Sequence, residues 1–137
     1  MAISSQTSDF SMPYRFENLE VWKEARIFVN TIYSITKTFP KDERFSLISQ
    51  LRRAALSVLL NITEGSDRKS DIEFIRFLRI SYTSMEEVIA ACYIALDQKY
   101  LPQQEFDSIY NLSHILGKKI NALIRSIQKV IPPPLTK

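Results

Sequence analysis

Residues 47–65 read LISQLRRAALSVLLNITEG, and this stretch decides the fold. Apolar side chains recur in it every three or four residues with polar side chains between them, which is the pattern of an amphipathic α-helix. The apolar positions are Leu47 or Ile48, Leu51, Ala55, Val58 and Ile62. Gly65 is followed by Ser66 and Asp67, and we predict that it ends the helix as a glycine C-cap.

Three further segments have the same helical period, and they cover residues 16–36, 70–98 and 101–129. The first ends ahead of Pro40, because the residue before a proline is disfavoured in the α conformation. The segment of residues 70–98 begins after Ser70, which together with Glu73 has the spacing of a capping box. Pro102 suits the first turn of the segment of residues 101–129.

Glycine is scarce, since Gly65 and Gly117 are the only two in 137 residues. All-β domains and phosphate-binding loops use glycine freely for tight turns. We therefore expect an all-α protein. The connections between the four segments are short, so sequential helices should run antiparallel and form an up-down-up-down four-helix bundle. The alternative is a long helical hairpin swapped between subunits, which the turn-like breaks disfavour.

The bundle is expected to occupy residues 16–130. Residues 1–15 are polar and aperiodic and are predicted to be a disordered leader, and residues 131–137 are predicted to be a proline-rich tail. The leader lacks the apolar run of a secretory signal, and no apolar run approaches the ~20 residues of a membrane span. We therefore expect a cytoplasmic protein without a membrane partner.

The beginning of the segment of residues 70–98 is apolar on almost every side. At about 100° per residue, large apolar side chains point nearly all the way round it. These side chains are Ile72, Phe74, Ile75, Phe77, Leu78 and Ile80. Phe28, Leu56 and Leu60 also lie off the apolar stripes of their own helices. Each helix of a monomeric bundle should keep a solvated face, so we predict a homo-oligomer.

Catalytic and metal-binding constellations are hard to build from this sequence. His114 is the only histidine and Cys92 the only cysteine, which excludes zinc sites of closely spaced Cys and His ligands. Cys92 lies on an apolar helical stripe, where a buried structural thiol is expected rather than a nucleophile. Glu86 and Glu87 are adjacent and diverge on a helix. We expect no enzymatic activity, no catalytic residue, no metal site and no cofactor.

Positive charge is the main candidate for function. The formal net charge is +3 and the pI is about 9.0, and residues 102–137 hold five basic and two acidic residues. Such a surface can neutralise the phosphates of a nucleic acid, although a solvated helix face would have the same pattern. The candidate contacts are Arg52, Arg53, Arg68, Lys69, Arg76, Arg79, Lys118, Lys119, Arg125 and Lys129.

Two smaller groups have structural interpretations. The tyrosines that are candidates for stacking on bases suit a core or an interface better, and they are Tyr82, Tyr93, Tyr100 and Tyr110. Asn61 and Glu64 lie near the end of the second helix, where they are expected to fix the corner by bonding Arg68, Ser70 or a neighbouring subunit.

Ordered motifs along the chain resemble one bacterial family. The motifs are Phe16-Glu17-x-Leu19-x-Val21-Trp22-x-x-Ala25, Ile32-Tyr33-x-x-Thr36-x-x-Phe39-Pro40, Gln50-x-Arg52-Arg53-Ala54-Ala55-x-Ser57, Asn61-Ile62-x-Glu64-Gly65, Arg68-x-Ser70-x-x-Glu73-Phe74-x-x-Phe77-Leu78 and Tyr100-Leu101. Over about residues 16–129 the chain resembles the four-helix-bundle family named for 23S rRNA intervening sequences. Gln98-Lys99 stand where that family commonly has a glycine before the tyrosine.

The resemblance implies an up-down bundle that assembles into a ring-like homopentamer. A related branch comprises the accessory variability proteins of diversity-generating retroelements, whose basic rings bind nucleic acid and a reverse transcriptase. We therefore expect a non-enzymatic homo-oligomer that binds RNA or DNA through basic surfaces. The alternative is a protein-binding scaffold or accessory subunit, for example for a reverse transcriptase, without nucleic-acid contact of its own.

Overall fold

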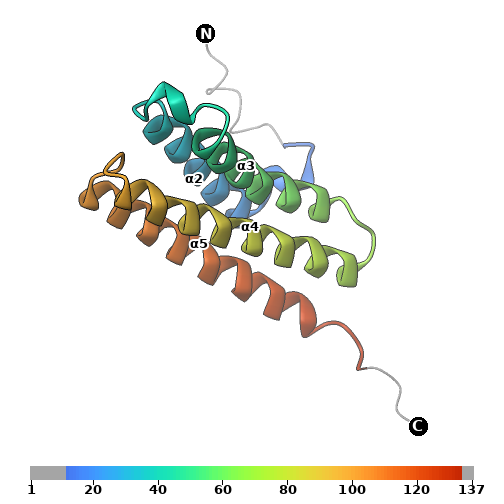
Figure 1. Ribbon diagram of the computed structural model, residues 1–137. Coiled ribbons are helices and arrows are strands. Elements are labelled where there is room, and N and C mark those ends of the chain that lie inside the picture. Colours follow the sequence, from blue (N-terminus) through green and yellow to red (C-terminus); the bar gives the residue numbers. More distant parts are fainter. Residues whose placement is uncertain (1–11, 134–137) are drawn as a thin grey trace, which may run out of the picture.

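The computed structural model describes residues 12–133, and this part of the chain is all-α with four long helices (Figure 1). The long helices are α2 (Glu20–Thr36), α3 (Leu47–Ser66), α4 (Asp71–Asp97) and α5 (Gln103–Gln128), and the short 3-10 helices are η2 (Arg15–Asn18) and η3 (Lys41–Glu43). The predicted fold class is therefore confirmed. Residues 1–11 of the predicted leader and 134–137 of the predicted tail lie outside the described residues.

The connections between the long helices alternate between the two ends of the bundle, which is consistent with the predicted up-down-up-down arrangement (Figure 1). Each helix packs against the next along the chain, and α2 packs against α5 to close the bundle. Within residues 12–133, the backbones of α3 and α5 do not approach one another closely, and neither do those of α2 and α4. Those two pairs therefore occupy the diagonals of the bundle.

The α2 helix begins later than the sequence pattern indicates. Residues 15–18 form the 3-10 helix η2, and Leu19 is extended, with φ −83° and ψ 129°. The buried face of α2 also includes Phe28, which the sequence analysis placed off the apolar stripe. Phe28 is wholly inaccessible within a single chain, so a second subunit is not needed to cover it.

The α4 helix has two contact faces rather than one. Tyr82, Met85 and Ile89 line the groove toward α5 and follow the helical period of apolar residues in this segment. A second face, directed at α3, contains small polar residues that the apolar pattern does not reveal. Ser81 Oγ donates a hydrogen bond of 2.7 Å to the Val58 carbonyl oxygen. The hydroxyl oxygens of Ser57 and Ser84 lie 2.8 Å apart.

These two faces account for most of the apolar surplus at the start of α4. Phe74, Ile75 and Leu78 are buried within one chain, and Phe77 is half-buried. Ile72 and Ile80 remain exposed, at 64% and 38%. Of the six side chains, only Ile72 and Ile80 therefore remain exposed for a partner subunit to cover.

Gly65 has a different role from the predicted C-cap. It lies inside α3 without a positive φ, and Asp67 is the C-cap residue. A Cβ atom at position 65 would lie 2.7 Å from Phe77 Cβ and 3.0 Å from Phe74 Cδ1. Glycine is therefore required for the close approach of α4 to α3. At the next boundary Ser70 is the N-cap as predicted, because its Oγ accepts a 3.3 Å hydrogen bond from the Glu73 amide, while the Glu73 carboxylate bonds Arg76 and does not complete the capping box.

The α2–α3 and α4–α5 turns meet at one end of the bundle. Tyr100 Oη donates a 3.0 Å hydrogen bond to Glu43 Oε2, and the Tyr100 ring packs on Phe39. Hydrogen bonds from Ser46 and then Tyr100 lower the pKa of the Glu43 carboxyl, and the bond to Glu43 raises the pKa of the Tyr100 hydroxyl. Lys99 beside it has φ 64°, the left-handed conformation that glycine adopts most easily.

We expect Gly65→Ala to lower the free energy of unfolding by about 1–3 kcal/mol, the usual cost of overpacking a well-packed contact. Phe77 Cβ is attached directly to the backbone and cannot move aside without shifting α4. Gly117→Ala is the matched control, because its Cβ would meet only the mobile ends of Met85 and Tyr82, at 3.0 and 3.1 Å. Urea unfolding measures both variants, and equal stabilities would contradict the close-approach role of Gly65.

Tyr100→Phe is expected to lower the Tm near neutral pH, because it removes the hydrogen bond to Glu43. The pH range over which the Tm falls is set by the pKa values of the Glu43 carboxyl and the Tyr100 hydroxyl. The lowered pKa of Glu43 means that its contribution is present above the ordinary value of 4.5 and is lost as pH falls through the folded value. The raised pKa of Tyr100 means that its contribution is present below 10.0 and is lost as pH rises through the folded value.

The Tm difference between wild type and Tyr100→Phe should therefore shrink below about pH 4 and above about pH 10. Thermal melts followed by circular dichroism across this range measure the difference. Tyr110→Phe changes an exposed tyrosine and serves as the control. A difference that stayed constant from acid to alkaline pH would disprove the coupling between Tyr100 and Glu43.

Candidate nucleic-acid interface

The clearest unneutralised charge lies along α5. Lys118, Arg125 and Lys129 are spaced by seven and four residues, which places them within about 20° of the Lys118 direction on a helix. All three are exposed, and none forms an ion pair with a carboxylate in residues 12–133. We call these three residues the α5 stripe.

The sequence around the α5 stripe contains no compensating acid. Residues 108–133 have four basic residues and no Asp or Glu. The fourth basic residue, Lys119, turns toward α2, where its Nζ lies 2.9 Å from Glu24 Oε2 and 3.8 Å from Glu20 Oε2. The hydrogen bond to Glu24 is the main cause that raises the pKa of Lys119. Lys119 therefore closes the bundle, while the stripe faces solvent.

Two other candidates, Arg68 and Arg76, already form ion pairs within the chain. Arg68 pairs with Glu64, and Arg76 Nη2 lies 3.0 Å from Glu73 Oε1. Both guanidinium groups also lie over the Phe77 ring, 5.0 and 4.6 Å from its centroid. The two guanidinium groups cover the half-buried Phe77 ring while their charges stay hydrated, so their role is structural.

Arg52 is also engaged, since its Nε donates a 2.8 Å hydrogen bond to Thr36 Oγ1 and its guanidinium lies over the Tyr33 ring. Arg53, Lys69 and Arg79 are exposed and make no ion pair within the described part of the chain. Arg53 lies on α3, diagonally opposite α5. The structure therefore does not bring the ten candidates together on one surface.

The predicted corner pair divides between two positions. Glu64 reaches forward to Arg68 across the end of α3, as the sequence analysis expects. Asn61 reaches backward instead, and its Nδ2 donates to the Ser57 carbonyl oxygen at 2.8 Å and to Ser57 Oγ at 3.0 Å. Asn61 thus belongs to the polar contact between α3 and α4 rather than to the corner.

A groove between α4 and α5 borders the α5 stripe. Tyr82, Glu86 and Tyr93 from α4 face Tyr110 and Lys118 from α5 across it. Tyr93 and Tyr110 are 47% and 45% exposed, so they are not core residues of a single chain. Their positions off the buried stripes of both helices are the signal in the sequence that distinguishes them from Tyr82 and Tyr100.

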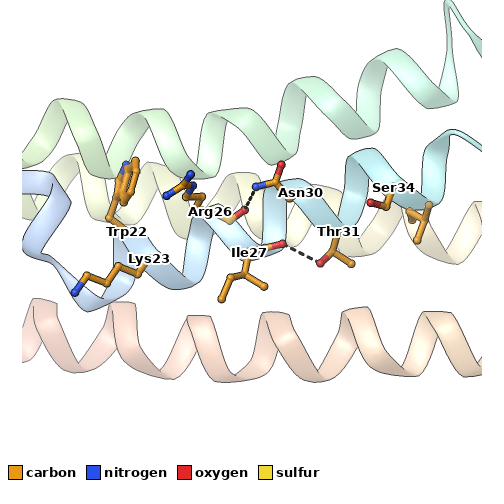
Figure 2. Close-up of a pocket in the computed structure, with 8 residues that line it drawn as sticks. Trp22, Lys23, Arg26, Ile27, Asn30, Thr31 and Ser34 are labelled. Atoms are coloured by element: carbon orange, nitrogen blue, oxygen red, sulfur yellow. Dashed lines mark hydrogen bonds between the residues drawn. The ribbon is translucent and has the colours of Figure 1, made fainter. Parts of the chain in front are cut away.

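A second hollow lies on the outer face of α2. Figure 2 shows that its lining side chains, from Trp22 to Ser34, come from one helix and that two of them bond to backbone oxygens of that helix. Asn30 Nδ2 donates to the Arg26 carbonyl oxygen and Thr31 Oγ1 to that of Ile27. The Trp22 Nε1 atom donates to Thr63 Oγ1 on α3. No set of reactive groups converges on this hollow.

The two residues most relevant to catalysis lie apart. Cys92 is fully buried, and burial raises the pKa of its thiol to about 12, so the thiol stays protonated at neutral pH. His114 is exposed on α5. Among the described residues, no three His, Cys, Asp or Glu side chains are placed to hold a metal ion. No described helix is both long and apolar enough to cross a membrane.

The fold places the chain in the class of small, all-α four-helix proteins. The chain belongs to the 23S rRNA-intervening sequence protein family, whose sequence model matches residues 17–122. This confirms the resemblance seen in the motifs.

Comparison with solved structures supports the same fold. A crystal structure of a protein of unknown function from the S23 ribosomal protein family of Bacteroides thetaiotaomicron is similar, with a TM-score of 0.71 at 23% sequence identity. The similarity covers 77% of this chain and 98% of that one. Among curated proteins, none matches this chain significantly.

Proposed function

We propose that this protein is a non-enzymatic homo-oligomer that binds nucleic acid in the cytoplasm, with the α5 stripe contacting phosphates. The observation that carries the proposal is the alignment of Lys118, Arg125 and Lys129 on one exposed face of α5, within a stretch (108–133) that contains no Asp or Glu. Phosphate neutralisation by Lys and Arg supplies most of the affinity of sequence-independent binding. Membership of a family named for an rRNA intervening sequence is consistent with such a partner.

The size of the stripe explains why assembly matters to this proposal. Three phosphate contacts give a salt dependence of only about −2.7 in log K against log salt for a duplex. One subunit would therefore bind weakly at physiological salt. A homo-oligomer, such as the pentamer that the family resemblance implies, repeats the stripe and raises the effective local concentration of binding sites.

Exposed apolar side chains support the oligomeric part of the proposal. Ile72 on α4 is 64% exposed, and Leu60 on α3 and Ile115 on α5 are also exposed. Isolated exposed apolar residues are common, but here they occur on all four long helices, with Ile27 exposed on α2. Burying such residues against another copy would remove apolar surface from water at about 25 cal/mol per Å².

The second candidate function is a scaffold or accessory subunit that binds protein, for example a reverse transcriptase, and makes no nucleic-acid contact. Phe45 favours it, because this ring projects from the α2–α3 turn with 86% of its surface exposed. An exposed aromatic ring is a common anchor in protein interfaces. The two candidates differ in a simple property, since only the first predicts salt-dependent binding to nucleic acid.

Replacing the α5 stripe with glutamines at Lys118, Arg125 and Lys129 should weaken binding to duplex DNA and structured RNA. The slope of log K against log salt should become shallower by about 2–3 per subunit engaged. The control is Arg53→Gln, Lys69→Gln and Arg79→Gln together, which removes equal charge elsewhere. Filter binding at about 50 and 200 mM salt measures both sets. Equal losses in the two sets would contradict the α5 assignment.

The oligomeric state is tested by a separate measurement of the mass in solution. Light scattering after size-exclusion chromatography at micromolar concentration should give a mass that is a multiple of the 15.9 kDa chain, with five copies expected from the family resemblance. Ile72→Asp together with Leu60→Asp should shift that mass toward the monomer while helicity is retained. A wild-type protein that stays monomeric would count decisively against the oligomer.

A further inference from the structure

We propose that the groove between α4 and α5 binds the unstacked bases of a single-stranded nucleic acid, while the adjoining α5 stripe holds its phosphates. This inference rests on the proposed function and narrows its ligand from nucleic acid in general to single strands. The two helices run side by side (Figure 1), and side chains of both line the groove.

The aromatic rings of the groove are exposed and held in place. The Tyr93 ring centroid lies 4.7 Å from that of Phe106, and the Tyr110 centroid lies 5.9 Å from it. Phe106 is buried, so the two tyrosines rest on the core while nearly half of each remains accessible. Fixed, accessible aromatic faces are what bases stack on, whatever their sequence.

Small residues of both helices line the groove between its aromatic rings. Ala90 lines its α4 side, and Ser113 and Gly117 line its α5 side. Tyr82 and Tyr93 are eleven residues apart on one helix, which corresponds to roughly 16 Å. Successive phosphates of a stacked duplex strand are about 3.4 Å apart along the helix axis, and an unstacked strand is longer per nucleotide, so the groove spans only a few nucleotides.

Polar groups in the groove match the two parts of a nucleotide. Lys118 lines the groove itself and is also the first residue of the α5 stripe, so the phosphate contacts continue from the groove toward Arg125. Glu86 and Asn121 also line it, and they offer a carboxylate and an amide to base edges. A carboxylate accepts hydrogen bonds from base amino groups such as cytosine N4. The Glu86 charge disfavours phosphate at its own position, which orients the strand.

A base-paired duplex does not fit this arrangement. Its bases are stacked on one another, and only their edges are accessible in the grooves. The exposed rings of Tyr93 and Tyr110 would then contribute nothing. The groove therefore predicts a preference for single strands that the α5 stripe alone does not confer.

The test uses the full-length protein and a fluorescein-labelled oligouridine of about 12 nucleotides at about 50 mM salt. Tyr110→Leu and Tyr93→Leu should each weaken binding about tenfold, because base stacking is lost while Phe106 stays covered. Tyr110→Phe and Tyr93→Phe keep the rings and should stay within about twofold of wild type. Binding to an RNA duplex should be the same in all four variants.

A second measurement keeps the test valid if a leucine variant folds poorly. Tyr110→Trp places an indole in the groove, and oligouridine should quench its fluorescence by stacking. The native Trp22 lies on the α2 hollow and should not respond. Quenching at position 110 without a change in the wild-type signal supports the inference.

Each contrary outcome has a distinct meaning. If wild type binds oligouridine and the leucine variants bind equally well, the inference is overturned and the proposed function stands. If the leucine variants change the mass in solution but not the affinity for oligouridine, the groove is an interface between copies and the inference is again overturned. If wild type binds neither oligouridine nor duplex at low salt, both proposals fail.

Discussion

The close contact between α3 and α4 is the constraint on which the rest of the structure depends. It requires glycine at position 65, where any Cβ would overlap Phe77, and it is held by the hydrogen bond from Ser81 to the Val58 carbonyl. Because Phe77 of α4 lies against Gly65 of α3 and Ser81 of α4 bonds to α3, the rotation of α4 about its own axis is fixed. That rotation turns Tyr82, Met85 and Ile89 toward α5 and leaves Tyr93 at the surface. The geometry of the α4–α5 groove therefore follows from a contact on the opposite side of the helix.

The basic residues of this chain form two groups, those paired with acids inside the fold and those exposed to solvent. Arg68 and Arg76 are paired with acids of their own helical region and cover Phe77, and Lys119 joins α5 to α2 through Glu24. These basic residues stabilise the fold and have little potential left for a ligand. Lys118, Arg125 and Lys129 lie on the side of α5 that has no acidic neighbour in sequence. Neighbours on one helix, such as Lys118 and Lys119, can thus have different roles because adjacent residues point about 100° apart.

Periodicity in the sequence was enough to predict four helices and most of their ends, since buried apolar stripes and caps such as Ser70 are local signals. It did not reveal the role of Gly65, because a glycine near a helix end has the same local pattern whether it caps the helix or admits a neighbour. The second face of α4 was missed for a similar reason, since Ser81 and Ser84 do not look like buried residues. The positions of Tyr93 and Tyr110 off the buried stripes are visible in the sequence, but the groove that they border depends on how α4 and α5 pack, and only the tertiary structure specifies that.

Side chains from distant parts of the sequence fasten both ends of the bundle. At one end Tyr100 bonds Glu43, which is 57 residues away. At the other, the Arg15 guanidinium donates to the Ser66 carbonyl oxygen and lies over the Phe74 ring. Helix ends ordinarily open by local fraying, at little cost in free energy. Here the opening of either end requires release of a contact with another hairpin or with the segment before α2. We therefore expect the helix ends to open together with these partners, so that hydrogen exchange of the amides at one end is coupled to release of the contact there.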